Sequence, residues 1–444
     1  MNGMKYESIK TTILIILVLS SIVLTWTLWT YQPEYKAIEG DNLVQEVTEN
    51  VKKETSLIIK PSKILYHIDG QHFGTFSETE LNRVMKEIGT WEIQDVQNIT
   101  HAVQEVGLAD FLSQSGHAEI FFPDPFPLQL YKSFLKINDK EHSLISFDRF
   151  VIDVNSENRE EGIVYFVSTG DNLVYEARIN SRLTRDFKRS FYNTAKRYPE
   201  QIEYSLSETN SVYLPKDETV VNRLDYFTDT IDIKTFIDRL FTDPDLVKGD
   251  RLSTGEVHTD GTRLLRVFNN QKYIEFINPT GMSGNQSDTT DLIQTSIDFV
   301  NEHVGWTDDY RFFSWNKESQ TTVFKLYVKN IPVFDHRGLV DITQQWENNE
   351  IVKYDHPMVS LQIGLPPSPE NLLKGELVME KITSKRDFNP ELLDSVTVAY
   401  ELKENEDNSQ FVSLQPIWSY RYNGQWGKVD VKGEDIGGRE DGLE

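Results

Sequence analysis

The spacing of apolar residues changes sharply once along this chain, close to its start. Residues Thr11 to Tyr31 (TTILIILVLSSIVLTWTLWTY) carry no charge, whereas the remainder mixes apolar with charged positions throughout. At about 1.5 Å per residue, a helix over this segment is roughly 31 Å long, which matches the roughly 30 Å hydrocarbon core of a bilayer. The pattern predicts a single transmembrane helix over residues 11–31.

Charges on either side of this segment predict its orientation. Lys5 and Lys10 precede it, whereas acidic residues follow it from Glu34 onward. Because positively charged flanks stay on the cytoplasmic side, residues 1–10 are expected in the cytoplasm and the bulk of the chain outside. Four residues are expected to anchor the helix at the membrane interfaces, where lysine and amphipathic rings are favoured: Lys10, Trp26, Trp29 and Tyr31.

A cleaved secretory signal is the alternative interpretation. Such signals have a shorter apolar core, of about 7 to 15 residues, which ends at small residues. Val18 and Ser20 offer only a poor cleavage site, because the apolar run continues beyond them and the bulky Trp26 follows. An uncleaved anchor in the cell membrane is therefore the preferred interpretation.

The first exterior residues read as strand, turn and helix. A strand over 63–68 is followed by a helix over 81–88, and Ser77 with Glu80 has the spacing of a capping box before that helix. Residues 144–178 alternate apolar and polar positions between turn signals, which predicts an antiparallel meander.

Prolines predict the end of another early strand. The strand-like run 118–122 is followed by Pro123, Pro125 and Pro127. Because proline has no backbone N–H to donate, these residues are expected to prevent continued strand pairing.

The later residues predict further strands with a few helices. Helical spacing covers 232–241 and 289–303, and a short helix is expected over about 370–376. Asn423-Gly424 is the strongest turn signal of the chain. Strands are expected at 264–268, 272–277, 310–315, 322–328, 331–334, 339–346, 350–354, 396–402 and 415–422.

Together these patterns predict an α+β fold, with one N-terminal transmembrane helix followed by a multi-domain extracytoplasmic region of antiparallel sheets with packed helices. The predicted segments are a cytoplasmic N-terminus at 1–10, the membrane helix at 11–31, a stalk at 32–60, an N-terminal α+β domain at 61–202, a middle α+β domain at 203–305, a mainly β C-terminal α+β domain at 306–432, and an acidic, frayed tail at 433–444.

Composition narrows the possible functions. The chain has 45 basic and 70 acidic residues, a formal net charge of −25, and no cysteine. It therefore has no disulfide framework and no thiolate chemistry. An acidic surface repels nucleic acid, whose binding needs clustered Lys and Arg. No such footprint is identified, although Arg182 to Arg197 forms a basic amphipathic stretch.

No motif specifies catalysis, a cofactor or a metal. The nine histidines include no metal-spaced pair, and His67 and His72 are five residues apart. Asp153 to Glu157 begins like a calcium loop but lacks the required Gly and Glu, so we interpret it as a polar turn. Acidic residues such as Asp225, Asp229 and Asp232 fit a solvated face better than a glycosidase pair. No catalytic, cofactor-binding or metal-ligating residue is predicted, and no small-molecule substrate is evident.

The start of the chain resembles a known family. Ser8-Ile9-Lys10-Thr11, Leu24-Thr25-Trp26 and Trp29-Thr30-Tyr31-Gln32-Pro33 are similar to the opening of YycH proteins. Over the exterior part the resemblance rests on layout and on segments such as Ile331-Pro332-Val333-Phe334. YycH proteins are bitopic accessory proteins of low-GC Gram-positive bacteria. The resemblance implies a three-domain α+β exterior region and brings no catalytic residues.

The resemblance also implies a regulatory role and partners. YycH proteins associate with the sensor histidine kinase YycG, also called WalK, and with the sister protein YycI through membrane helices and exterior domains. Ser21 and Thr25 lie four residues apart, a small-xxx-small pattern that lets a partner helix approach closely. They are the candidate transmembrane contacts, although a plain tether with incidental hydroxyls remains an alternative.

Two hypotheses follow. The first is a non-enzymatic, membrane-anchored modulator of a YycG/WalK-like kinase that works together with YycI. The second is a membrane-anchored cell-surface enzyme or wall-binding protein, for which single carboxylate or histidine changes outside the membrane would abolish function.

Overall fold

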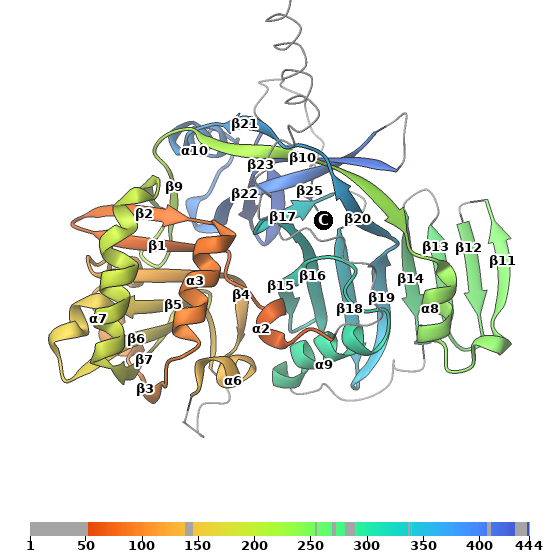
Figure 1. The fold of residues 1–444 in the computed structure, drawn as a ribbon, viewed down its shortest axis with the longest axis horizontal. Coiled ribbons are helices and arrows are strands. Elements are labelled where there is room, and N and C mark those ends of the chain that lie inside the picture. The colour runs from red at the N-terminus through yellow and green to blue at the C-terminus, as the bar shows by residue number, and fades with distance from the viewer. Residues whose placement is uncertain are drawn as a thin grey trace, which may run out of the picture. The chain divides into compact units, whose positions relative to one another are not determined.

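Two sheets with helices packed on them make up the described part of the chain (Figure 1). The computed structural model describes residues 52–137, 145–253, 255–268, 272–279, 289–335, 338, 340–405, 410–430 and 442–443. The predicted α+β class with antiparallel sheets is confirmed. The predicted membrane helix at 11–31 lies outside the described residues.

The first sheet has nine strands within the described residues, in the order β3-β7-β6-β5-β4-β1-β2-β8-β9. All of its neighbouring strands pair antiparallel. The strands are β1 (Lys63–Ile68), β2 (Gln71–Thr75), β3 (Gln94–Asn98), β4 (His117–Pro127), β5 (Ser146–Asp153), β6 (Glu161–Ser168), β7 (Leu173–Asn180), β8 (Glu200–Ser205) and β9 (Ser211–Pro215). The predicted strand at 63–68 and the predicted meander are confirmed.

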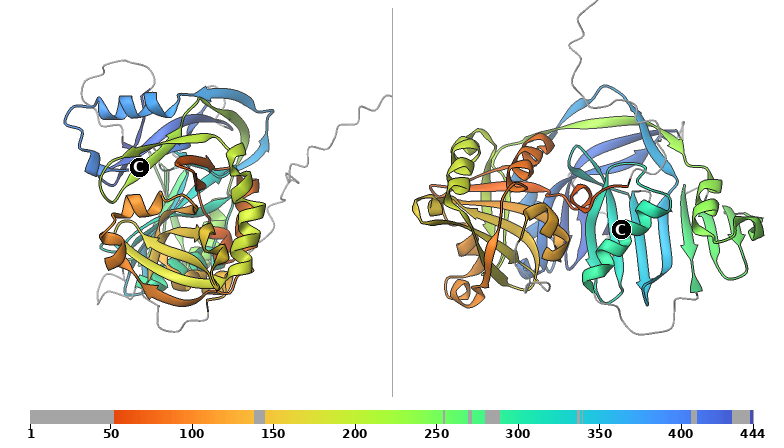
Figure 2. Two further views of the ribbon diagram at one scale, coloured as in Figure 1. Left: turned by 90° about the vertical axis from the view of Figure 1, so that its left-hand side faces the viewer. Right: turned by 60° about the horizontal axis from the view of Figure 1, so that its bottom comes forward.

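Helices cover both faces of this sheet, which explains the unbroken apolar run in β6. Val164 and Phe166 join the core under α3 (Glu78–Ile88) and α7 (Ser181–Ser190). Ile163, Tyr165 and Val167 point the other way and pack with α4 (Thr100–Gln104) and α5 (Leu108–Leu112). A strand buried on both faces needs apolar residues at every position. The side view in Figure 2 shows helices on both sides of these strands.

The second sheet has 16 strands within the described residues and holds the rest of the fold. Its pairings are antiparallel except for β17 with β22, which run parallel. The strands are β10 (Thr219–Thr230), β11 (Lys248–Leu252), β12 (Gly255–Thr259), β13 (Leu264–Phe268), β14 (Tyr273–Ile277), β15 (Tyr310–Asn316), β16 (Thr321–Val328), β17 (Ile331–Phe334), β18 (Asp341–Glu347), β19 (Glu350–Pro357), β20 (Val359–Gly364), β21 (Ser368–Leu372), β22 (Leu393–Glu404), β23 (Phe411–Tyr422), β24 (Gln425–Lys428) and β25 (Gly442–Leu443).

The helix α9 (Thr289–Glu302) lies across this second sheet, as Figure 2 shows in its right-hand view. Ser296, on its buried face, donates a hydrogen bond to Thr322 of β16 over 3.2 Å and accepts one from the indole of Trp346 over 3.0 Å. Burial of Ile293, Ile297 and the rest of the predicted apolar stripe holds α9 in place. This helix and the Asn423-Gly424 turn before β24 are confirmed predictions, and both turn residues have positive φ as that turn requires.

The remaining helices are short. They are α2 (Thr55–Ile58), α6 (Lys132–Leu135), α8 (Ile233–Leu240) and α10 (Gly375–Thr383), with 3₁₀ turns at Leu128–Tyr131, Val154–Asn158, Tyr192–Arg197, Pro244–Leu246 and Pro390–Leu392.

The predicted capping box at the start of α3 is wrong. Ser77 occupies the N-cap position, but its side chain makes no capping hydrogen bond. The Glu80 carboxylate instead accepts hydrogen bonds from Arg83 at 2.7 Å, Arg197 at 3.0 Å and the Tyr198 hydroxyl at 2.7 Å. Two guanidinium groups and a phenol outcompete one local amide for this carboxylate, because hydrogen bonds to charged donors are stronger.

The prolines after residue 122 do not end their strand, which corrects a second prediction. β4 runs from His117 to Pro127, but its pairing with β5 is interrupted between Phe121 and Phe126. The chain stays extended there because no β5 partner requires the N–H groups that proline lacks. This unpaired part of β4 contacts the second sheet, where the Trp315 indole donates to the Pro125 carbonyl over 2.8 Å.

The expected helix at 370–376 is also wrong. Residues Ser368–Leu372 form β21, which pairs with β10, and the helix α10 begins only at Gly375. The long-range partner strand decides the conformation here, since a short segment has little helical preference of its own.

Strand pairs cross the boundaries of the three predicted domains. The division into these domains stays a prediction. The boundary at 203 falls inside β8, and β10 and β14 of the predicted middle domain pair with β23 and β19. Ile58 and Ile59, at the end of the predicted stalk, are fully buried in the core. Within the predicted tail, Gly442–Leu443 pairs with β24.

A substitution at Gly375 tests how closely α10 packs against β9 of the first sheet. A Cβ at this position would lie 2.4 Å from Leu214 Cβ and 2.8 Å from the Pro215 carbonyl oxygen of β9. We expect Gly375→Ala to lower the free energy of unfolding by about 1 to 3 kcal/mol, because overpacked positions have to shift backbone. Denaturant unfolding measures this. Gly170→Ala is the control, since nothing lies within 4 Å of its Cβ position. Equal stability of both variants would contradict the packing described.

Candidate functional site

The site residues predicted from sequence all belong to the N-terminal segment. Ser21, Thr25 and the interfacial anchors Lys10, Trp26, Trp29 and Tyr31 lie outside the described residues. Among the helices that the structure does describe, none has the length and apolar character needed to cross a membrane. The membrane contacts therefore stay predictions, and the described residues offer other candidates.

A buried histidine pair is the most unusual polar cluster of the first sheet. His67 of β1 and His72 of β2 are direct cross-strand partners beside the Asp69-Gly70 turn, and their Nδ1 atoms are 2.7 Å apart. His67 Nε2 lies 2.6 Å from Glu119 Oε1 of β4. His67 and Glu119 are 1% and 2% exposed, so water cannot supply alternative partners.

The pair continues toward the surface through another carboxylate. His72 Nε2 is 3.5 Å from Glu203 Oε2 of β8, and the Tyr213 hydroxyl donates to Glu203 Oε1 over 3.1 Å. The two ring hydrogen bonds of the pair, Nδ1 to Nδ1 and His67 Nε2 to Glu119, need two ring hydrogens, which two neutral imidazoles supply.

Burial and charge determine how the cluster titrates. Burial lowers the pKa of His72, and the neighbouring His67 lowers it further. Burial alone would raise the pKa of Glu119, but the hydrogen bond and charge of His67 outweigh it and lower that pKa. Among the described residues, no group of three or more His, Asp or Glu side chains has the arrangement of a metal site.

Sequence reasoning missed this pair because it tested His67 and His72 only against helical metal spacing. The usable signal was the turn at Asp69-Gly70, whose hairpin register places residues 67 and 72 opposite each other. The carboxylate of Glu119 comes from a strand far along the chain, and no local pattern indicates it.

A buried arginine connects the two sheets. Arg311 of β15 is 1% exposed, and its guanidinium contacts Asp309 as well as Glu78 Oε1 of α3 at 2.7 Å. It also donates to the Asn330 side chain, whose amide nitrogen donates to the Ser62 carbonyl over 2.8 Å. Asn330 has the positive φ of the β16–β17 turn, a conformation that asparagine tolerates.

The carboxylates considered for hydrolysis have local structural roles. Asp225 lies 3.5 Å from the guanidinium of Arg223, and Asp232 caps α8 by accepting from the Lys234 amide over 2.9 Å. Asp229 accepts from the amide of its own neighbour. These contacts fit the interpretation of a solvated face rather than a pair aimed at a substrate.

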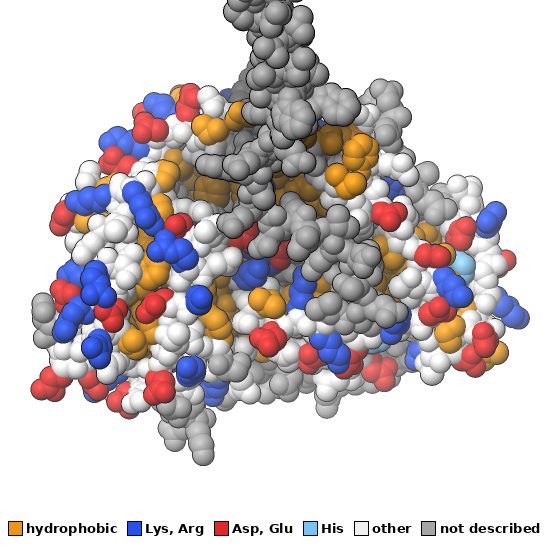
Figure 3. All heavy atoms as spheres, in the orientation of Figure 1, with side chains coloured by type: hydrophobic (Ala, Val, Ile, Leu, Met, Phe, Trp, Pro, Cys, Tyr) orange, Lys and Arg blue, Asp and Glu red, His pale blue; other side chains and the backbone are white. Residues whose placement is uncertain are grey.

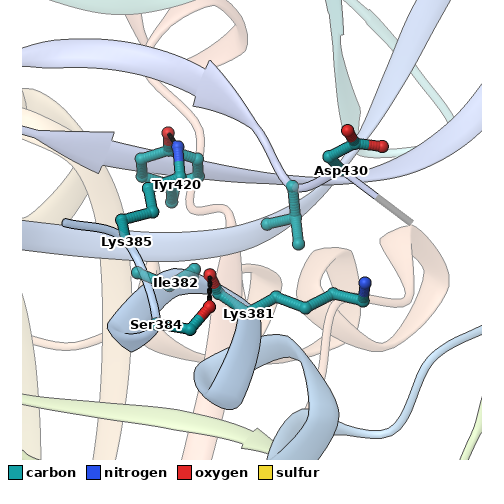
Figure 4. A pocket seen from close by; sticks show the side chains of 7 residues that line it. Lys381, Ile382, Ser384, Lys385, Tyr420 and Asp430 are labelled. Atoms are coloured by element: carbon teal, nitrogen blue, oxygen red, sulfur yellow. Dashed lines mark hydrogen bonds between the residues drawn. The ribbon is translucent and has the colours of Figure 1, made fainter. Parts of the chain in front are cut away.

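A small cavity of about 150 Å³ lies between the end of α10 and the strands β23 and β24 (Figure 4). The Lys385 ammonium donates to the Tyr420 hydroxyl, and the Ser384 hydroxyl donates to the Lys381 carbonyl over 3.0 Å. Ser384 therefore faces a main-chain oxygen rather than a base. The lining residues are Lys381, Ile382, Ser384, Lys385, Tyr420, Val429 and Asp430.

Comparison with known proteins covers almost the whole chain. The family model for the YycH protein N-terminal domain matches residues 7–194, and that for the YycH protein C-terminal domain matches residues 209–435. The chain belongs to the YycH family. The resemblance noted at its first residues thus extends through both sheets.

Two relatives of this YycH chain come from Bacillus subtilis. It is 26% identical over 438 residues to the "Two-component system WalR/WalK regulatory protein YycH" of strain 168, covering 95% of this chain and 96% of that protein. It also matches the crystal structure of YycH from Bacillus subtilis with a TM-score of 0.72 and 23% identity, over 86% of this chain and 99% of that one. The second match shows that the fold is shared.

The histidine pair predicts an acid-sensitive stability. The folded pKa of His72 lies below its unfolded value of about 6.5, so the unfolded chain binds more protons as the pH falls through that range. The free energy of unfolding should therefore decrease from pH 7.5 to 5.5. The full decrease is about 1.4 kcal/mol for each unit by which the folded and unfolded pKa of His72 differ. His72→Gln should reduce this decrease in urea titrations, whereas His101→Gln, at a largely exposed position, should not. If the His72 variant keeps the pH dependence of the unaltered chain, the lowered pKa of His72 is refuted as its cause.

Proposed function

We propose that this YycH protein is a non-enzymatic regulator, anchored in the cell membrane, that modulates a YycG/WalK-like sensor histidine kinase together with a YycI-like sister protein. Its contacts are made by the transmembrane helix at 11–31 and by the extracytoplasmic region. The observation that carries the proposal is the family match, which includes residues 7–194 and therefore the whole apolar segment.

The relative's description supports the regulatory part of the proposal. That protein is named as a regulator of the WalR/WalK two-component system and aligns with 95% of this chain. The charge pattern around the apolar segment supports an N-terminus in the cytoplasm, which leaves the folded part outside, where it meets the exterior domains of its partners.

The energetic demand on such a regulator is small. A two-state kinase changes its ratio of states tenfold when a partner binds one state about 1.4 kcal/mol more tightly. Hydrogen bonds between membrane helices contribute about 0.6 to 2 kcal/mol. A contact that the hydroxyls of Ser21 and Thr25 make with the kinase in one state only would therefore be enough to bias it without any catalytic group.

The membrane contact is tested by Ser21→Leu combined with Thr25→Leu. We expect this variant to retrieve the kinase about threefold or more weakly from detergent-solubilised membranes, because bulky leucines prevent close approach and remove the hydroxyls. Retrieval is measured by co-purification at equal amounts of anchored chain. Ser20→Leu with Thr27→Leu is the matched control, since it changes the same residue types on the opposite face of the predicted helix.

Equal retrieval of the kinase by both double variants would count against this helix face. Loss of function from single exterior carboxylate changes, with the complexes intact, would instead favour the surface-enzyme alternative. An exterior fragment that cleaves or binds cell-wall material would support the same alternative.

A further inference from the structure

The helix α7 carries a row of exposed arginines. Arg182, Arg185 and Arg189 are all exposed, whereas Thr184 and Phe187 of the same helix are completely buried. Positions i, i+3 and i+7 lie on one face of a helix, so the three guanidinium groups form a continuous row. We call these three residues the arginine row.

The charge of this region contrasts with the rest of the protein. From Arg182 to Arg197 there are six basic residues and one acidic residue, although the whole chain has a net charge of −25. The neighbouring helix α3 adds Arg83, which stacks on the Phe191 ring beside α7. Figure 3 shows Lys and Arg side chains gathered over α7 and α3 at the left of the view.

Acidic neighbours neutralise only part of this charge. Arg189 pairs with Asp186 at 3.1 Å while remaining 78% exposed, and Lys188 pairs with Glu157 at 2.6 Å. Arg182 and Arg185 form no ion pair within the described part of the chain. The single polar contact of Arg185 there is with the main-chain carbonyl of Glu157, at 3.4 Å.

The stability of α7 does not explain the arginine row. Like charges three or four residues apart destabilise a helix by a few tenths of a kcal/mol. Arg182 also lies in the first turn, where the helix dipole disfavours a cation, and that turn contains no acidic residue. Arg189, in the last turn, is favoured by the helix dipole and by Asp186, but Arg182 and Arg185 bring their helix no such gain. Exposed cations without a structural role have the character of a binding surface.

We propose that the arginine row binds an acidic segment of a partner protein outside the membrane. This inference rests on the proposed function, because it names the chemistry of one exterior contact in the signalling complex. Guanidinium groups pair with carboxylates through two parallel hydrogen bonds, which makes arginine suited to such a contact.

A short acidic protein segment fits this surface better than an extended polyanion. At physiological salt, charges are screened beyond about 8 Å, so a short segment responds mainly to the local positive field. A long phosphate polymer or an anionic membrane also faces the acidic remainder of the chain, which repels it. Charge complementarity therefore favours a carboxylate-bearing protein as the occupant.

The test is charge reversal in the full, membrane-anchored chain. Arg182→Glu, Arg185→Glu and Arg189→Glu are combined, and co-purification of the WalK-like kinase and the YycI-like protein is measured. We expect retrieval of at least one of them to fall about tenfold, since attraction at three sites becomes repulsion. Raising NaCl from about 0.05 M to about 0.5 M should weaken retrieval by the unaltered chain toward the same level.

The matched control is Lys234→Glu, Lys248→Glu and Lys317→Glu, which changes the net charge equally at three exposed lysines of α8, β11 and the β15–β16 turn. It should retrieve both proteins like the unaltered chain. A second variant with glutamine at the three arginine positions removes attraction without adding repulsion, and it should lose less retrieval. Thermal unfolding should show the glutamine variant about as stable as the unaltered chain, because glutamine removes the like charges without adding new ones.

The outcomes separate this inference from the proposed function. If the charge-reversed chain retrieves both proteins as well as the unaltered chain does, the docking surface is wrong while the proposed function stands. If it loses only binding to inorganic polyphosphate, the row is an anionic-polymer site and the proposal is overturned. If the unaltered chain retrieves neither protein, both the proposed function and this surface are overturned.

Discussion

The buried guanidinium of Arg311 is the contact on which the arrangement of the two sheets depends. It comes from β15 of the second sheet, and it holds Glu78 at the start of α3, a helix that covers the first sheet. Removing one partner of a buried pair typically costs about 3 to 5 kcal/mol, because the remaining charges are left without compensation. Asn330 extends the same contact to the Ser62 and Phe76 carbonyls, which flank the β1–β2 hairpin on either side.

Other contacts reinforce this junction. Asp124, in the unpaired part of β4, accepts from the Trp315 amide at 3.2 Å and from Arg421 at 3.2 Å, which brings β15 and β23 onto the first sheet. Burial raises the pKa of Asp124 to about 6, although the charge of Arg421 partly offsets it. Residues 48–444 accordingly form one compact unit with a shared hydrophobic core.

Local patterns predicted much of this fold. The strands from β5 to β7, the helix α9 and the Asn423-Gly424 turn follow from periodicity and turn chemistry over a few residues. The failures all involve distant partners. Glu80 is drawn from its expected cap by Arg197, residues 368–372 become a strand because β10 lies beside them, and the prolines of β4 are accommodated by Trp315.

The candidate site was less accessible to sequence reasoning than the fold. The sequence shows a basic amphipathic stretch from Arg182 to Arg197, but the negative net charge of the whole chain argued against interpreting it as a binding surface. The partners of His67 and Arg311 lie on other strands and helices, and only the folded chain brings them together. The family resemblance at the first residues, by contrast, was visible in the sequence and is confirmed over residues 7–194 and 209–435.

Calorimetry tests most directly whether Arg311 joins the two sheets into one unit. The protein measured is the part of the chain from residue 52 onward. The account predicts a single transition whose calorimetric and van't Hoff enthalpies agree, as for a cooperative two-state unit. In Arg311→Met, this transition should move to lower temperature or split into two. Two separate transitions in the unaltered protein, or an unchanged single transition in the variant, would contradict the account.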